Sequence, residues 1–424
     1  MTNRFASKEI QFLKTESDDF HINPPEKYFS DLLLENPIQV KTFKNRLSKT
    51  KTDNNKFLCA VIQISTIKKM SKSLKEKSKE VFEDTFNSIL EIKGVDIKKK
   101  GRKKNAGKRG IWESLDETSF VMAFWDYKNE KKASDLILSM KEKISKSLKA
   151  DILIGAAKFP YENFSREETF DNALKAIDHA AFFGPDTLIH FDVTSLNISG
   201  DRFYHLNRYD MAKNEYRKGL EIEPDNLNLI NSLGVCFGIV GKLDMAKLEF
   251  DKAIKINPND VMVLYNIGLL HQIKDDIDKA VIYLRKAHGI DSSLFEVELL
   301  LGSLLMRENN FKQALPHLEK AGRINPESGL SSRMKGEIYL RTNLPEKAGT
   351  AFNKAIKINP RDAVSLSGYA RSLELQNKNL HIALSFAQNS VDISPENRLF
   401  QKRLKMIQKK IEKHPVSEKK SKSA

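Results

Sequence analysis

The 424-residue sequence has little cysteine and no long apolar run. Its two cysteines, Cys59 and Cys236, both lie within apolar stretches, which excludes a disulfide framework and a CxxC metal site and predicts buried, inert thiols. No window reaches the roughly 18 uninterrupted apolar residues of a membrane span. The first 30 residues lack the apolar core of a signal peptide. We therefore expect a cytoplasmic protein with no membrane span.

Recognisable catalytic and metal-binding patterns are also lacking. The nine histidines show no HExxH or comparable ligand spacing, so the sequence predicts no metal site and no cofactor. The stretch "GRKKNAGKR" does not form a phosphate-binding loop, because its first glycine is misplaced for GxxxxGK[ST] and Arg109 replaces the hydroxyl residue.

The net charge of +15 is concentrated in two segments. Residues 98–109 contain eight basic residues and no acidic one, and residues 398–424 contain ten basic and two acidic residues. Both have the composition of solvated segments. Contact with a polyanion is the alternative, but no aromatic residues are interleaved to stack on bases. Nucleic acid is therefore not the expected partner.

Prolines mark a period in the second half of the chain. They recur at intervals of 34, 68, 34 and 35 residues, with Ser292 in place of the missing member: Pro224, Pro258, Pro326, Pro360 and Pro395. Small and large side chains keep the same step: Gly234, Gly268, Gly302 and Gly336; Ala246, Ala280, Ala314 and Ala348; Ala253, Ala287, Ala321 and Ala355; and Phe250, Leu284, Leu318 and Phe352. The pattern therefore predicts two short helices in each unit, with small residues where the two helices approach closely and a proline after the second helix.

This pattern resembles the tetratricopeptide repeat, because spacing and residue type agree over several units. An earlier unit fits with Gly200, Phe203, Ala212, Tyr216 and Pro224. A sixth unit, from about residue 363, has Ala370 in place of the glycine and a second helix that begins one residue late. The resemblance implies an all-α solenoid of six repeats over 193–397, followed by a capping helix and basic tail over 398–424.

Such a solenoid has a concave groove lined by the first helix of each repeat. By analogy with the family, the groove positions are Asn228, Asn231, Tyr265, Leu269, Gln272, Met306, Arg333, Glu337 and Arg371. This mixture of polar and apolar side chains suits a protein or peptide partner. The groove positions contain neither a pair of acids nor a nucleophile beside a base, so they do not suggest catalysis. The alternative for each of these residues is that it only faces solvent and contacts no partner.

The first half of the chain has a different periodicity. Between residues 56 and 192, apolar runs and amphipathic stretches predict the order strand, helix, hairpin, helix, strand, helix, strand. This order indicates an α+β domain with helices packed on a mostly antiparallel sheet. Residues 1–55 form an N-terminal extension and linker.

The α+β order resembles the GGDEF and class III nucleotidyl cyclase domains. The stretch "ILIGAAKFP" is similar to a strand motif of the family, and "AIDHAAFFG" is similar to a helix motif, with Asp178 and Ala180 at matching positions. In that family, carboxylates hold two metal ions that bind the nucleotide triphosphate. Gln63 stands where the first strand supplies one of them, and a neutral amide cannot replace a carboxylate as a charged ligand.

The hairpin also departs from the family motif. Where the family carries GGDEF, this chain has "ESLDETSF"; aligning Phe120 with the motif's phenylalanine puts Thr118 and Ser119 over the acids, and Asp116 and Glu117 over the glycines. A two-residue slip would restore Asp116 and Glu117 as acids. On a plainer interpretation, Gln63 is strand filler and the two acids are ordinary turn residues.

Two functions remain open from the sequence. The first is a protein-protein interaction scaffold that joins a degenerate, inactive cyclase-like domain to a repeat groove. The alternative is a nucleotide-binding signalling regulator or residual diguanylate cyclase, in which Asp116 and Glu117 would contribute to nucleotide binding.

Overall fold

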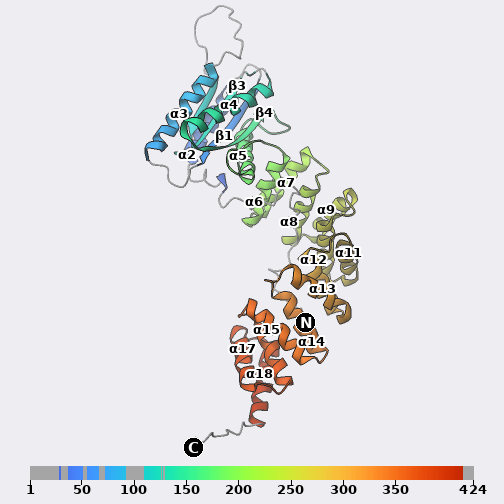
Figure 1. The fold of residues 1–424 in the computed structure, drawn as a ribbon. Coiled ribbons are helices and arrows are strands. Elements are labelled where there is room, and N and C mark those ends of the chain that lie inside the picture. Colours follow the sequence, from blue (N-terminus) through green and yellow to red (C-terminus); the bar gives the residue numbers. More distant parts are fainter. Residues whose placement is uncertain are drawn as a thin grey trace, which may run out of the picture. The chain divides into compact units, whose positions relative to one another are not determined.

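The computed structural model describes residues 28–29, 37–50, 55–65, 72–91, 109–125, 127 and 129–413 (Figure 1). The chain divides into two compact units. The N-terminal unit is Lys14–Lys242, and the C-terminal unit is Leu243–Ala424 with Met1–Leu13. Most of the basic segment 98–109 and residues 414–424 lie outside the described residues. None of the helices in the described ranges is long and apolar enough to cross a membrane.

The N-terminal unit contains a five-stranded sheet. Its order is β2 (Gly110–Ser114), β3 (Ser119–Trp125), β1 (Phe57–Ser65), β4 (Asp151–Phe159) and β5 (Leu188–His190). The first four strands pair antiparallel, whereas β4 and β5 run parallel. The sheet is therefore mixed, and the predicted order of strands, helices and hairpin agrees with the observed one.

Helices cover both faces of this sheet (Figure 1). Alternate residues of each strand point to opposite faces, so each face has an apolar core of its own. One core joins the sheet to α3 (Lys72–Glu91) and α4 (Glu130–Leu148). The other joins it to α2 (Pro37–Lys49) and α5 (Glu168–Ala180). Cys59 is buried in this second core, where burial raises the pKa of its thiol. Burial of both cysteines agrees with the prediction of inert thiols.

Helix α5 approaches β4 very closely at Gly155. A Cβ atom on this glycine would lie 2.1 Å from the backbone nitrogen of Ile177 and 2.3 Å from the backbone oxygen of Ala173. Only glycine allows this approach without moving the helix. The glycine of the "ILIGAAKFP" stretch thus has a packing role.

Three further helices belong to the N-terminal unit. They are α6 (Val193–His205), α7 (Tyr209–Ile222) and α8 (Leu227–Ile239), and the short 3₁₀ helix η2 (Ala181–Phe183) precedes them. Asp192 caps α6 by accepting a hydrogen bond from the backbone N–H of Ser195 at 2.9 Å. Leu196 of α6 and Ile222 of α7 pack on the core that contains α5. The first helix pair is therefore built onto the sheet domain.

The C-terminal unit consists of helices that continue the alternation of α6–α8. They are α9 (Leu243–Ile256), α10 (Val261–Ile273), α11 (Ile277–Ile290), α12 (Phe295–Arg307), α13 (Phe311–Ile324), α14 (Leu330–Arg341), α15 (Pro345–Ile358), α16 (Ala363–Leu375), α17 (Leu380–Ile393) and α18 (Arg398–Lys413). The expected glycine contacts are present, since Gly268, Gly302 and Gly336 face Leu284, Leu318 and Phe352. The predicted two-helix unit is confirmed.

The turns inside the helix pairs keep the same 34-residue step. Each has a residue in the left-handed region of the backbone at this step, with φ between 52° and 77°: Asn207, Gly241, Asp275, Asn309, Asn343 and Asn377. The last turn has a second left-handed residue, Asn379. Glycine, asparagine and aspartate adopt this conformation most readily. This conserved turn geometry includes the first and the last pair, where the sequence pattern is weakest.

Helix α18 ends the described array. Its Phe400 and Ile407 are buried, and Ile407, Leu404 and Ile411 belong to an apolar cluster shared with α16 and α17. The face away from this cluster carries exposed Lys402, Lys405 and Lys409, as expected of a terminal capping helix.

Candidate functional site

The positions predicted to be degenerate cyclase residues lie at one end of the sheet. Gln63 of β1 is the register partner of Ser119 in β3. Asp116 is in the hairpin turn, where its Oδ1 accepts hydrogen bonds from the backbone N–H groups of Thr118 and Ser119, both at 2.7 Å. Ser78 of α3 donates a hydrogen bond to the backbone oxygen of Glu117 at 2.9 Å. The carboxylate of Asp116 is thus engaged in holding the turn.

A cavity of about 10 Å³ lies beside Gln63. It is lined by Phe29, Val61, Gln63, Leu115, Asp116, Ser119 and Ile177. This volume corresponds to about one water molecule, and much of the lining is apolar. The cavity as described is too small for a nucleotide, and the aromatic ring of Phe29 belongs to its wall.

The predicted groove positions fall on first helices of the repeats. Asn228 and Asn231 are on α8 in the N-terminal unit, and the other seven are on α10, α12, α14 and α16 in the C-terminal unit. Asn231, Tyr265, Leu269 and Met306 are buried, whereas the remaining five are partly exposed: Asn228, Gln272, Arg333, Glu337 and Arg371. The partly exposed positions offer the most polar surface to a partner.

Three of these residues, Arg333, Glu337 and Arg371, gather near the end of the C-terminal unit. Helices α12, α14, α16 and α18 contact one another in turn. Arg333 of α14 lies 3.4 Å from Asp362 before α16 (Nη1 to Oδ1). Arg371 pairs with Glu374 on α16, and Glu374 also binds Nζ of Lys410 on α18 at 3.0 Å. Ion pairs thus connect three successive first helices.

Arg403 of α18 completes this arrangement, which we call the arginine cluster: Arg333, Arg371 and Arg403. Arg403 donates a hydrogen bond from Nη1 to Oγ of Ser367 at 3.1 Å, and burial lowers the pKa of its guanidinium. Burial also raises the pKa of Glu337, although the charges of Arg333, Arg341 and Arg403 oppose the rise. Three arginine side chains thus act on Glu337, and one of them, Arg333, is itself paired with Asp362.

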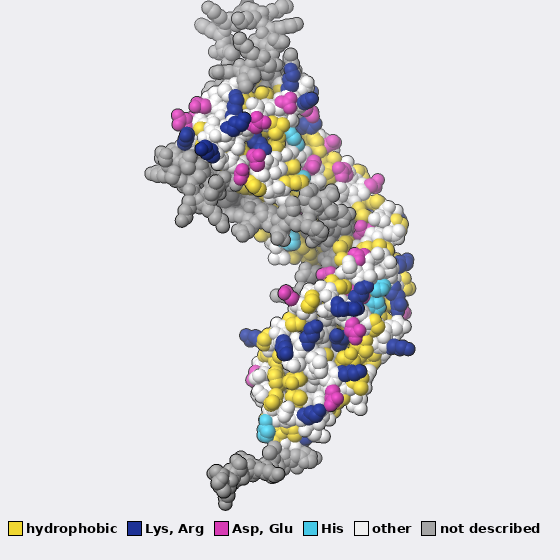
Figure 2. All heavy atoms as spheres, viewed as in Figure 1, with side chains coloured by type: hydrophobic (Ala, Val, Ile, Leu, Met, Phe, Trp, Pro, Cys, Tyr) yellow, Lys and Arg dark blue, Asp and Glu magenta, His cyan; other side chains and the backbone are white. Residues whose placement is uncertain are grey.

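Basic side chains are not restricted to this cluster. Figure 2 shows Lys and Arg side chains in dark blue over much of the displayed face of the C-terminal unit. Scattered surface charges of this kind contribute mainly to solubility and to steering of a charged partner. What distinguishes the arginine cluster is its partial burial and its hydrogen bonds across successive first helices.

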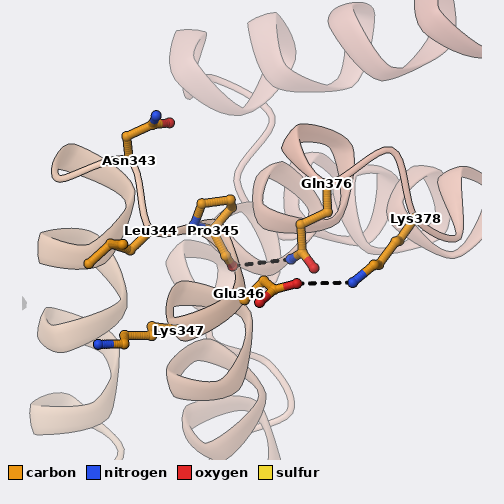
Figure 3. Close-up of a pocket in the computed structure, with 7 residues that line it drawn as sticks. All are labelled: Asn343, Leu344, Pro345, Glu346, Lys347, Gln376 and Lys378. Atoms are coloured by element: carbon orange, nitrogen blue, oxygen red, sulfur yellow. Dashed lines mark hydrogen bonds and ion pairs between the residues drawn. The ribbon is translucent and has the colours of Figure 1, made fainter.

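A surface pocket of about 400 Å³ lies at the turns that precede α15 and follow α16 (Figure 3). It is lined by Asn343, Leu344, Pro345, Glu346, Lys347, Gln376 and Lys378. Its polar groups already bind one another, since Nε2 of Gln376 donates to the backbone oxygen of Pro345 at 3.2 Å and Lys378 pairs with Glu346 at 3.1 Å. Most of the lining is exposed, unlike an enclosed ligand site.

One side-chain cluster was not anticipated from the sequence. Glu298 is fully buried and lies between His288 and His317, with all three ligand atoms within 4.8 Å of one another. The sequence separations of 10 and 19 residues match no metal-binding motif. Only the stacking of α11, α12 and α13 brings these residues together.

Comparison with known families identifies the helical part of the chain. Models described as tetratricopeptide repeat match residues 195–226, 227–260, 263–293 and 299–363. The chain contains tetratricopeptide repeats. The predicted resemblance is therefore confirmed for this part, and the helix pairs have the length and order of such repeats. Comparison with curated protein sequences gave no match.

Three solved structures match about half of this chain. PilF of Pseudomonas aeruginosa is 19% identical over 50% of this chain and 95% of its own, with a TM-score of 0.46. YrrB, described as having an unusual peptide-binding site, is 19% identical over 45% of this chain and 97% of its own, with a TM-score of 0.40. A repeat protein from Parabacteroides merdae is 16% identical over 51% of this chain and 98% of its own, with a TM-score of 0.38.

Proposed function

We propose that this chain is a protein-interaction scaffold whose tetratricopeptide repeats bind an extended segment of a partner protein. The observation that carries the proposal is the arginine cluster on the first helices of the C-terminal unit. Its guanidinium groups suit planar, bidentate recognition of carboxylates. The partner segment should therefore contain Asp, Glu or a free C-terminal carboxylate.

The sheet domain takes part in this proposal as a catalytically inactive, cyclase-like module over 56–192. Six repeats then occupy 193–397, and the capping helix and tail occupy 398–424. Three features support inactivity: Gln63 replaces a carboxylate, Asp116 is engaged in the turn, and the adjoining cavity has the size of a water molecule. Incubation with GTP or ATP and Mg²⁺ or Mn²⁺ should give no cyclic product and no heat of binding. Product formation would overturn this part of the proposal.

Binding of model peptides tests the scaffold function. Fluorescence anisotropy would compare a labelled Glu-rich peptide with a Gln-rich peptide of equal length, on the full chain. We expect preference for the acidic peptide, weakened at least tenfold in the double variant Arg333→Gln, Arg371→Gln, because each charge-assisted contact contributes about 1.5–3 kcal/mol. The matched control removes the same charge from exposed Arg361 and Arg398. Equal binding by both double variants would contradict the proposal.

A further inference from the structure

The cluster of His288, Glu298 and His317 spans three consecutive helices. His288 is in the last turn of α11, Glu298 is in the first turn of α12, and His317 is near the middle of α13. The side chain of Glu298 has no solvent exposure, whereas the side chains of His288 and His317 are 35% and 17% exposed. A buried acid thus lies behind two imidazoles that reach the surface.

The contacts within the cluster are short. Nδ1 of His288 lies 2.7 Å from Oε1 of Glu298, and Nδ1 of His317 lies 2.6 Å from Oε2. The two rings are 5.0 Å apart and nearly perpendicular, at 83°. Burial opposes ionisation of Glu298, but hydrogen bonds from both histidines outweigh it and hold the pKa of the carboxyl below its usual value. Both oxygens of the Glu298 carboxyl group are thus held by short contacts to imidazole nitrogens.

Two imidazole nitrogens and one carboxylate oxygen form a common donor set for Zn²⁺. Each Nδ1 must first pass its proton to Nε2 or release it to solvent, because only an unprotonated nitrogen binds the ion. The ion holds such ligands at about 2.0–2.2 Å in a tetrahedron, with about 3.3 Å between neighbouring ligand atoms. The candidate ligand atoms lie within 4.8 Å of one another, so closing around an ion requires the partly exposed imidazoles to shift by on the order of 1 Å. Three protein ligands leave a fourth coordination position, and the exposure of His288 gives it access to solvent or to a partner's side chain.

Lys320 opposes a cation here. Its Nζ lies 3.3 Å from Oε1 of Glu298. The side chain is 31% exposed and long, so it can turn away when a metal ion neutralises the carboxylate. Asp291 offers another partner, because the charge of Lys320 already contributes to the lowered pKa of that carboxyl.

We propose that His288, Glu298 and His317 form a binding site for one divalent transition-metal ion, with Zn²⁺ the best match, and with one coordination position left open. The ion fixes α11, α12 and α13 to one another. The proposal is independent of the groove function, since its residues lie outside the arginine cluster. An open position on the array surface could also be filled by a ligand from a bound partner.

Cobalt titration of the metal-free full chain tests the proposal. Co²⁺ in a tetrahedral site absorbs visible light strongly, and Zn²⁺ should displace it. We expect one Co²⁺ per chain, with the absorption lost in His317→Gln and retained in the matched control His271→Gln. His271 is paired with Asp276 at 3.4 Å on another surface of the same unit. Absence of the tetrahedral spectrum, or its persistence in His317→Gln, would overturn the proposal.

A second variant keeps the test decisive if His317→Gln fails to fold. Lys320→Ala removes only the competing ammonium group of a partly exposed side chain. We expect it to bind Co²⁺ about fivefold more tightly, which is the effect of removing one screened charge near the site. Unchanged or weaker binding by a folded Lys320→Ala protein would contradict the metal site.

Discussion

Nζ of Lys175 lies 2.7 Å from Oε2 of Glu215, with side-chain exposures of only 14% and 9%. This ion pair joins α5 of the sheet domain to α7 of the first repeat. A second pair, Glu168 with Lys218 at 2.6 Å, joins the same two helices. The first repeat is therefore attached to the sheet by polar contacts as well as by its apolar face.

Breaking the Lys175–Glu215 pair should destabilise the N-terminal unit. Glu215→Gln leaves a largely buried ammonium group without its counter-ion, and we expect a loss of about 2 kcal/mol in the free energy of unfolding. Both tryptophans, Trp112 and Trp125, lie in the sheet, so tryptophan fluorescence during urea unfolding reports on this unit alone.

Two further variants serve as controls for this ion pair. Glu130→Gln breaks the exposed pair with Lys158 and should cost at most about 0.5 kcal/mol. The double variant Lys175→Met, Glu215→Leu should recover most of the loss, because apolar side chains can replace a buried pair. If Glu215→Gln costs no more than Glu130→Gln, the junction does not depend on this contact.

The pH dependence of the second pair follows from Glu168. Burial acts to raise its pKa, but hydrogen bonds from Lys218 and Ser165 outweigh this effect and lower the pKa to about 2. Since the folded-state pKa is depressed, the stabilisation is present above the unfolded value of about 4.5 and is lost as the pH falls toward 2. The stability difference between wild type and Glu168→Gln should shrink over this interval.

Exposed Glu167 provides the control for that titration. Glu167→Gln should change the free energy of unfolding by no more than about 0.5 kcal/mol, because its side chain loses little solvent on folding. Urea unfolding at several pH values measures both. A Glu168→Gln difference that does not change with pH would contradict the assignment.

The repeat glycines provide a test of packing. At Gly302 a Cβ atom would lie 2.7 Å from Cδ2 of Leu318, which is fully buried. We expect Gly302→Ala to destabilise the C-terminal unit by about 1–2 kcal/mol, because overpacking exceeds the gain in helix propensity. Thermal unfolding followed by circular dichroism measures the change.

Gly289 of α11 is the matched position. Nothing lies within 4 Å of a Cβ atom placed there, so Gly289→Ala should stabilise the unit by about 0.5–1 kcal/mol through helix propensity alone. Opposite signs for the two substitutions would support the packing described here. A loss of stability in both variants would contradict the open surroundings of Gly289.

Two substitutions distinguish the hydrogen-bonding role of Asp116 from a role of its negative charge. Asp116→Ala removes the acceptor for the N–H groups of Thr118 and Ser119 and should cost about 1–2 kcal/mol, measured by tryptophan fluorescence. Asp116→Asn keeps an acceptor oxygen and should retain most of the stability. Equal losses in both would indicate that the charge matters, as a metal-binding or nucleotide-binding acid would require.

The repeat period could be predicted from the sequence because each repeat packs mainly on its neighbours. Gly302 and Leu318 are in close contact, as their positions in the repeat predicted. The turn residues with a left-handed backbone recur at the same spacing of 34 residues, from Asn207 to Asn377. Local geometry that recurs at a fixed spacing can be predicted from the amino-acid sequence.

Contacts that occur once in the chain could not be predicted in this way. His288, Glu298 and His317 do not recur at equivalent positions of other repeats, so no period reveals them. The parallel pairing of β4 with β5 and the ion pair of Lys175 with Glu215 depend on how whole elements dock. Arg333 and Arg371 lie on α14 and α16 and are partly buried, and their place in a binding groove stays a prediction.

Attachment of α6 and α7 to α5 has a consequence for how the repeat array ends. A solenoid needs closed ends, because an uncovered terminal repeat offers its apolar face to another molecule. The sheet domain covers the first repeat within the N-terminal unit, and α18 covers the last helix pair of the C-terminal unit and carries a lysine-rich face. A fragment that begins at α6 would expose an adhesive surface, so truncation should produce self-association before it produces a usable isolated array.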